Sequence, residues 1–213
     1  MNADFHRGQI IKGNTRIHTL QYSEFNPEAY LHVLTPEELE RYKGFRHIKR
    51  QREFIATRSL RHTLYGFEHI HYTAEGAPFI QKDTYISISH SKNLIAIAEN
   101  HEFPIGLDLE AVRHDIQRVM HKFLSDDELE LFDCNDPSLV TSIWSAKETL
   151  YKLAGRKQII FIDELQITKD GDQWKGRIKN PGHDLLVNLD IFEIDGIIFT
   201  LNTSKVEYIE RHS

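Results

Sequence analysis

The chain has 213 residues, a formal net charge of −6 and one cysteine. This length can bury the core of one large domain or two small ones. The acidic balance argues against a general nucleic-acid binder, and a single cysteine excludes an internal disulfide. Nothing in residues 1–11 resembles the charged and apolar regions of a signal peptide, and the longest apolar runs are too short to span a bilayer. We therefore expect a soluble, cytoplasmic protein that binds neither nucleic acid nor membrane.

The first half of the chain is predicted to contain two helices among several strands. Thr35 is a typical helix cap, because Pro36 follows at the first helical position and Glu38 can complete a capping box. Apolar spacing predicts a longer helix over 48–65 that ends at Gly66. The strands predicted up to the middle of the chain are 15–21, 85–89, 94–99 and 105–110.

Helices come next, and short alternating runs complete the chain. Helices are predicted over 116–122, 126–132 and 137–154, and Gly155 stops the last of them. The element order predicts two α+β halves with a boundary near 101–104. Four short runs favour an antiparallel sheet in the last quarter, and they are 165–168, 173–178, 186–192 and 197–202.

One segment is basic although the chain is acidic. Between Glu38 and His62 the arginine and lysine side chains clearly outnumber the glutamates. Such local asymmetry indicates a specific anionic ligand or partner. The alternative for most of these side chains is a solvated helix face.

Two carboxylates share one face of the strand predicted at 105–110. Successive strand side chains point to opposite faces, so Asp108 and Glu110 lie roughly 7 Å apart on the same face. Burying two unpaired carboxylates at this separation is unfavourable. A bound hard cation removes the penalty, and Mg²⁺ takes a few oxygen ligands when a phosphate completes its shell.

The helix predicted over 137–154 contains a charge within its apolar stripe. Lys147 lies on that stripe, Glu148 lies at its edge one turn beyond Trp144, and Lys152 follows Glu148 by one turn. A functional site can explain such an inconsistency. The alternative is a snorkelling lysine beside a solvated pair of Glu148 and Lys152.

Together these segments resemble the signature of the 4'-phosphopantetheinyl transferase superfamily. The signature is Ile-Gly-hydrophobic-Asp-x-Glu, found here at 105–110, followed at the family's spacing by Trp-Ser-x-Lys-Glu-x-x-x-Lys, found at 144–152. Either segment alone is weak, whereas both in this order are specific. The resemblance is to the long, two-subdomain, surfactin-synthetase-activating type.

Weaker matches extend the resemblance to residues 35–168. Ser-Ile-Ser-His-Ser at 87–91 resembles the family's Ser-His element, and Phe-Leu-Ser at 123–125 with Glu128 resembles a Phe-x-Ser-x-x-Glu element. Ala77 stands where a Gly-Lys-Pro turn of the family has lysine, so one phosphate or ribose contact is in doubt. Lys82 is a candidate replacement.

The resemblance implies a fold of two similar α+β subdomains, residues 1–103 and 104–213, with the ligand cleft between them. It also implies transfer of 4'-phosphopantetheine from coenzyme A to a serine of an apo acyl or peptidyl carrier protein, with release of 3',5'-ADP. Asp108, Glu110 and Glu148 would bind Mg²⁺. Coenzyme A would be contacted by Arg41, Arg52, Ser89, His90, Lys147 and Lys152.

The resemblance does not single out one general base. Glu148 and Glu128 are the candidates, and Glu128 ranks first because metal binding makes Glu148 a poorer base; Lys147 is also assigned to catalysis. The alternative for Glu128 is a plain helix N-terminus capped by Ser125. Met120, Phe123 and Leu124 could contact the acidic helix of a carrier protein or belong to the core.

We expect a monomer. Two alternative functions remain, a catalytically silent relative that still binds coenzyme A and an unrelated Mg²⁺-dependent phosphohydrolase. The sequence does not indicate which carrier protein is served, nor whether Mg²⁺ or Mn²⁺ is preferred.

Overall fold

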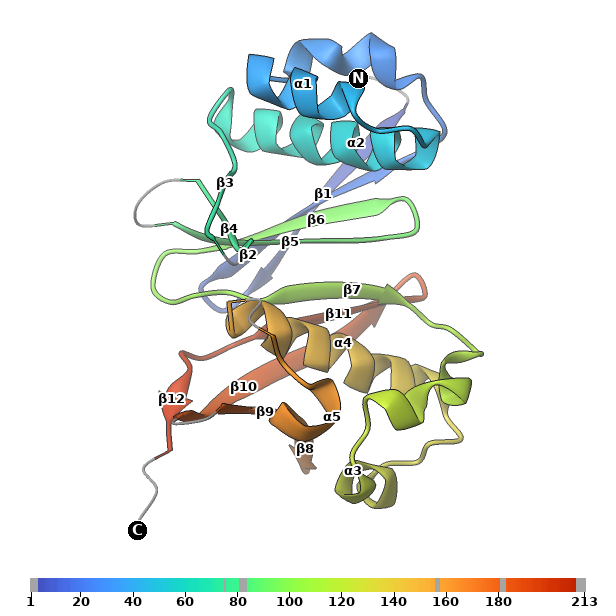
Figure 1. Cartoon of the computed structure of the whole chain (residues 1–213), viewed down its shortest axis with the longest axis vertical. Helices are drawn as coiled ribbons and strands as arrows, with labels where there is room; N and C mark the ends of the chain where they lie inside the picture. Colours follow the sequence, from blue (N-terminus) through green and yellow to red (C-terminus); the bar gives the residue numbers. More distant parts are fainter. Residues whose placement is uncertain (1–3, 75, 81–83, 156–157, 181–182, 210–213) are drawn as a thin grey trace.

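The computed structural model describes residues 4–74, 76–80, 84–155, 158–180 and 183–209. It has the expected mixed α+β fold, in which two antiparallel sheets lie between two main helices (Figure 1). Helix α2 (Ile48–Tyr65) covers the outer face of the first sheet, and α4 (Pro137–Leu153) covers the outer face of the second. Lys82 lies outside the described residues. Among the residues that are described, no helix is both long enough and apolar enough to cross a membrane.

The first sheet is built from the first 100 residues in the order β1-β2-β6-β5-β4-β3. Its strands are β1 (Phe5–Lys12), β2 (Thr15–Tyr22), β3 (His71–Tyr72), β4 (Pro78–Phe79), β5 (Tyr85–Ser91) and β6 (Leu94–Asn100). Between β2 and β3 the chain forms a 3₁₀ helix (Pro27–Val33), α1 (Pro36–Lys43) and α2 (Ile48–Tyr65).

The second sheet has the order β7-β11-β10-β9-β8, and β12 pairs with β10. Its strands are β7 (Leu107–Ala111), β8 (Leu165–Asp170), β9 (Gln173–Asn180), β10 (His183–Ile194), β11 (Ile197–Asn202) and β12 (Glu207–Tyr208). The helices between β7 and β8 are two 3₁₀ helices (Ile116–Arg118 and Met120–Lys122), α3 (Asp126–Leu131), α4 (Pro137–Leu153) and α5 (Phe161–Glu164).

Local sequence signals determine where α1 begins and where α2 ends. The Thr35 hydroxyl accepts a hydrogen bond from the Glu38 N–H, and the Glu38 carboxylate accepts one from the Thr35 N–H, so the predicted capping box is present. Helix α2 has the predicted bounds and ends at Gly66, whose φ of 62° suits glycine. These predictions are confirmed.

One predicted helix differs from the structure, and strand β1 was not predicted. The helix predicted over 116–122 is a pair of 3₁₀ helices, because Val119, with φ −119° and ψ 0°, lies outside the helical region and interrupts the segment. Strand β1 has no clear sequence signal, since Phe5 is its only buried side chain and its residues lack an apolar alternation.

A buried interior joins the two sheets. Sheet 1 packs one face against α2 and turns the other face toward β7 and β11. The side chains between the sheets are Ile17, Ala96, Ala98, Ile105, Leu107, Leu109, Ile197, Phe199 and Leu201. The layers therefore follow the order α2, sheet 1, sheet 2 and α4 (Figure 1).

A row of serines also connects the two sheets along their edges. Alternate residues of β5 face the edge of β7 that is not paired with β11. We call this row the serine seam: Ser87, Ser89 and Ser91 accept hydrogen bonds from the N–H groups of Leu107, Leu109 and Ala111, at 2.9, 3.1 and 2.8 Å. The predicted boundary at 103/104 falls in the connection between β6 and β7, and the division into domains stays a prediction.

Candidate functional site

The two carboxylates of β7 point toward α4, while Leu107 and Leu109 point into the interior between the sheets. The Asp108 side chain is buried and receives three hydrogen bonds. Its Oδ1 accepts from the Ser89 hydroxyl at 3.0 Å and from the Lys152 ammonium at 2.9 Å, and its Oδ2 accepts from the Ser145 hydroxyl at 2.9 Å. Donors from β5 of the first sheet and from α4 therefore converge on this carboxylate of the second sheet.

Glu110 is held by an aromatic group of α4. Its Oε1 accepts a hydrogen bond from the Trp144 indole at 2.8 Å. The indole itself stacks on Phe161, with ring centroids 5.4 Å apart, and meets the edge of Phe123 at 5.0 Å. Burial and the charge of Asp108 raise the pKa of Glu110 against the opposing effect of the Trp144 hydrogen bond. Its ionised form is therefore disfavoured, and a nearby cation would relieve that cost.

Glu148, the third predicted metal ligand, lines a hollow beside α4. Glu148 is half-buried and lines a hollow of about 670 Å³ together with Trp144, Tyr151 and the segment 158–161. Within the described part of the chain, no three His, Cys, Asp or Glu side chains form a group that could hold a metal ion. Carboxylate oxygens are the ligands that a hard cation prefers. That these three carboxylates come together around one cation stays a prediction.

Lys147 and Glu128 form a buried ion pair. The Lys147 ammonium, at 0% exposure, lies 2.6 Å from Oε2 of Glu128, at 3% exposure, and donates to the carbonyls of Phe123 and Phe161. Glu128 also completes the capping box of α3 with Ser125 and accepts from the Ile167 N–H. Burial lowers the pKa of Lys147 although Glu128 opposes the shift. This geometry favours a structural role for both side chains, including the helix N-terminus alternative for Glu128.

A basic pocket of about 540 Å³ lies beside α2 and brings several predicted ligand residues together. Arg41, His90 and the Gly76–Pro78 turn all reach it. The Arg41 guanidinium lies over the rings of Phe54 and Tyr72, and within the described part of the chain no carboxylate pairs with it. The remaining lining residues are Arg50, Glu53, Thr57, Arg58 and Ile88.

His90 connects the basic pocket with the acidic strand. Its Nε2 lies 3.7 Å from Oε2 of Glu53. Burial lowers the pKa of His90; the charges of Arg50 and Lys152 act in the same direction, and Glu53 and Asp108 oppose them. The residue before it, Ser89, donates to Asp108, so strand β5 places the basic pocket next to the acidic strand.

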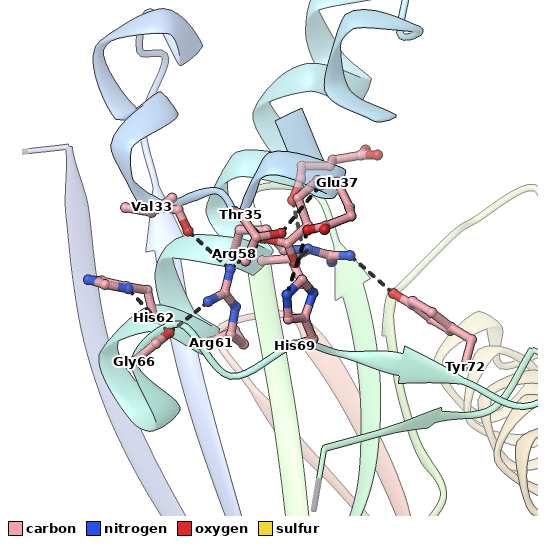
Figure 2. Close-up of polar contacts among 12 residues, drawn as sticks. Val33, Thr35, Glu37, Arg58, Arg61, His62, Gly66, His69 and Tyr72 are labelled. Atoms are coloured by element: carbon pink, nitrogen blue, oxygen red, sulfur yellow. Dashed lines mark hydrogen bonds and ion pairs between the residues drawn. The ribbon is translucent and has the colours of Figure 1, made fainter. Parts of the chain in front are cut away.

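The wall of the basic pocket is stabilised by a cluster of ion pairs and hydrogen bonds that includes Arg58 and Arg61 (Figure 2). Arg58 and Arg61 are buried and contact the Glu38 carboxylate at 2.9 and 2.6 Å. Arg58 also approaches the Tyr72 hydroxyl at 3.4 Å, while Arg61 donates to backbone carbonyls of Val33 and Gly66. These contacts hold the side chains of Arg58 and Arg61 in place. Arg41 is a less constrained cation of the pocket than Arg58.

Arg52 lies away from this pocket. It donates from Nε to the Phe25 carbonyl at 2.9 Å and pairs with Glu24 at 3.4 Å. It lines a separate hollow beside Asn93. On α2, positions 50, 53, 54, 57 and 58 share the face toward the pocket, and position 52 lies on another face.

A smaller hollow of about 460 Å³ lies on the α4 side of the acidic strand. Arg113 and Lys122 border it, and aromatic rings of Phe123, Trp144 and Phe161 line it. Phe123 and Leu124 are nevertheless buried in the core of the second half, with Met120 packed against that core. The core alternative therefore describes these side chains better, although the Phe123 ring also reaches the hollow.

Sequence reasoning named the carboxylates and missed the groups that hold them. Ser145 and Trp144 were identified only as parts of the signature, and no hydrogen bond was assigned to either. Their positions three and four residues before Glu148 placed them on the helix, but only the packing of α4 on β7 shows which carboxylate each one meets. Tyr72 was missed because its short strand has no sequence signal.

Comparison with known proteins gives a match to a family model and similarity to curated relatives. Residues 104–191 match the family model described as the 4'-phosphopantetheinyl transferase superfamily. The chain is 29% identical over 164 residues to the 4'-phosphopantetheinyl transferase HetI of Nostoc sp., covering 66% of this chain and 69% of that protein. It is 30% identical over 114 residues to the 4'-phosphopantetheinyl transferase gsp of Aneurinibacillus migulanus, covering 50% of this chain and 47% of that protein.

Proposed function

We propose that this chain transfers the 4'-phosphopantetheine group of coenzyme A to a serine of an apo acyl or peptidyl carrier protein, because residues 104–191 match the family model of the 4'-phosphopantetheinyl transferase superfamily. The second product is 3',5'-ADP. The observation that carries the proposal is the basic pocket at His90 next to the acidic strand of Asp108 and Glu110. A ligand with a pyrophosphate needs both features, cations for its phosphates and carboxylates for a bound cation.

The basic pocket is the proposed site for the nucleotide end of coenzyme A. Arg41 offers a planar guanidinium that suits a phosphate, and its position over Tyr72 and Phe54 keeps it oriented. His90 is 46% exposed and adds a donor to the pocket. Arg50 is the further cation that we assign to this ligand, in place of Arg52.

The acidic strand is the proposed site of Mg²⁺. Asp108, Glu110 and Glu148 would supply its protein ligands, and the raised pKa of Glu110 supports a cation there. Bound Mg²⁺ would polarise the phosphoryl oxygen and neutralise the leaving 3',5'-ADP. Lys152, now on Asp108 and the Leu107 carbonyl, would supply positive charge at the same place.

We propose Glu148 as the general base. A base must come within hydrogen-bond reach of the serine hydroxyl, directly or through one water. Glu128 is buried against Lys147, so a carrier serine could reach it only after the ion pair had opened. Glu148 is half-buried and lines an open hollow, which supports its selection over Glu128.

The carrier protein is proposed to dock at the smaller hollow beside Trp144. The resemblance implies that carriers present their serine at the start of an acidic helix. Arg113 and Lys122 would attract that helix, and the rings of Phe123 and Phe161 would contact its apolar side chains.

Mass spectrometry of carrier proteins tests the proposal. Purified protein is incubated with coenzyme A, Mg²⁺ and several apo carriers, and each carrier is weighed. We expect a mass gain of one phosphopantetheine that Asp108→Ala abolishes. Binding of 3',5'-ADP with no mass gain on any carrier would instead identify a silent relative. Hydrolysis of coenzyme A without a carrier would identify a phosphohydrolase.

A further inference from the structure

Two buried serine hydroxyls hold the Asp108 carboxylate from different elements. Ser89 of β5, at 5% exposure, donates to Oδ1 at 3.0 Å. Ser145 of α4, at 0% exposure, donates to Oδ2 at 2.9 Å. Both hydroxyls point at one carboxylate, which is a ligand in the proposed metal site.

Strand alternation separates Ser89 from its neighbour His90. Successive residues of a strand face opposite sides. On β5 the serines face β7, whereas His90 faces α2 and lines the basic pocket together with Ile88. A phosphate bound in that pocket would therefore meet His90, while the Ser89 hydroxyl is already engaged with the Leu109 N–H and Asp108.

The hydrogen bonds to Asp108 are unevenly divided between its two oxygens. Each carboxylate oxygen offers about two lone-pair directions. Oδ1 receives Ser89 and Lys152, so both of its directions are used. Oδ2 receives only Ser145 among the described residues, which leaves one direction of Oδ2 for another partner.

We propose that Ser89 and Ser145 are positioning residues that orient the Asp108 carboxylate and present Oδ2 to the divalent cation. This inference rests on the proposed function, because it assumes a cation at Asp108. Donors behind a metal ligand restrict its rotation and set the direction of its free lone pair. Ser89 is thereby assigned to the carboxylate and not to a phosphate of coenzyme A.

The serine seam provides a matched control for this role. Ser89→Ala removes one seam hydrogen bond and the contact with Asp108. Ser91→Ala removes the equivalent seam hydrogen bond, to the Ala111 N–H, and touches no carboxylate. Ser145→Ala removes the contact with Asp108 and no seam bond. Comparing the three variants separates orientation of Asp108 from stability of the seam.

The experiment measures Mn²⁺ binding by electron paramagnetic resonance and metal-free 3',5'-ADP binding by calorimetry. We expect Ser89→Ala and Ser145→Ala each to weaken Mn²⁺ binding by about 10- to 100-fold. Ser91→Ala should leave the Mn²⁺ Kd unchanged, and all three should bind 3',5'-ADP as the parent does. Thermal unfolding of each variant checks that it is folded.

Specific results would overturn the inference. If Ser89→Ala weakens 3',5'-ADP binding and leaves the Mn²⁺ Kd unchanged, Ser89 is a phosphate contact. If Ser89→Ala does not fold, an unchanged Mn²⁺ Kd in Ser145→Ala decides against the inference. If Asp108→Ala itself leaves Mn²⁺ binding unchanged, the cation lies elsewhere and the metal site of the proposed function fails first.

Discussion

Lys147, in the apolar stripe of α4, is neutralised by a carboxylate from another helix. Lys147 suggested a functional charge because it interrupts the apolar stripe of its helix. In the structure its partner Glu128 comes from the start of α3, and the two are buried together. Such a pair adds little net stability, yet losing one member is costly because the other charge stays buried and unpaired.

Lys147→Met should therefore lower the free energy of unfolding by about 3–5 kcal/mol. Urea denaturation measures the loss. The double variant Lys147→Met/Glu128→Gln should recover part of it, since the unpaired charge is gone. An unchanged free energy of unfolding together with weaker coenzyme A binding would show that Lys147 acts on the ligand instead.

At the scale of elements, the contact between α4 and β7 builds the acidic site. The two elements approach closely at Gly106, directly before β7, where an added Cβ would lie 2.7 Å from the Thr149 carbonyl and 2.9 Å from Leu153 Cγ. This approach brings Ser145 and Lys152 onto Asp108. The glycine of the Ile-Gly-Leu-Asp segment is thus a packing requirement of the site.

Gly106→Ala should push α4 away from β7 and destabilise the protein by about 1–3 kcal/mol, the usual cost of overpacking. Transfer activity should also fall, because donors on α4 would leave Asp108. Gly44→Ala is a milder comparison, since its Cβ would meet the Arg41 carbonyl at 3.3 Å, against 2.7 Å at Gly106, and φ there is −75°. Melting temperatures of the two variants that fall equally would argue against a special contact at Gly106.

A second contact between elements should make stability depend on pH. The Tyr65 hydroxyl at the end of α2 donates to Glu99 of β6 at 2.6 Å. Burial acts to raise the pKa of Glu99, but the hydrogen bonds from Tyr65 and His18 outweigh it and lower the pKa below its usual 4.5. Ionised Glu99 therefore stabilises the fold above pH 4.5, and this contribution is lost as the pH falls through the lowered pKa.

Tyr65→Phe should destabilise the protein at pH 7 by about 1.5–3 kcal/mol, the range for a hydrogen bond to a charged group. The difference from the parent should shrink as the pH falls below 4.5. Chemical denaturation at a series of pH values measures it. Tyr42→Phe is the control, because the described residues include no hydrogen bond to the Tyr42 hydroxyl. A difference that is constant across the pH series would contradict the explanation.

Over the whole molecule, the two sheets depend on each other for burial. The inner faces of β6, β7 and β11 cover one another, and several side chains between them are fully buried. Separating the halves would expose this apolar surface to water and lose the serine seam. We expect the two halves to unfold as one unit.

Residues 104–213 expressed alone should therefore bind the dye ANS and melt without a sharp transition. The parent chain should show coincident transitions by near- and far-ultraviolet circular dichroism. A separate half that is monomeric, binds no dye and melts cooperatively would show that the interior between the sheets is dispensable.

Local signals predicted much of this fold, and long-range packing determined the rest. The capping box at Thr35, the bounds of α2 and the end of α4 depend on neighbours in sequence, so pattern reasoning found them. It also found Asp108 and Glu110 on one face. It did not find the partners of Asp108, Lys147 or Arg52, because each partner is distant in sequence and is brought close only by packing.

The serine seam has a consequence for insertions and deletions. Both of its strands repeat every two residues, so a slip of one position would lose all three hydrogen bonds and turn Asp108 toward the interior. Lengthening the connection between β6 and β7 leaves this register untouched. Chain length is therefore free to vary just before the acidic strand and fixed within it, where one extra residue would dismantle the site.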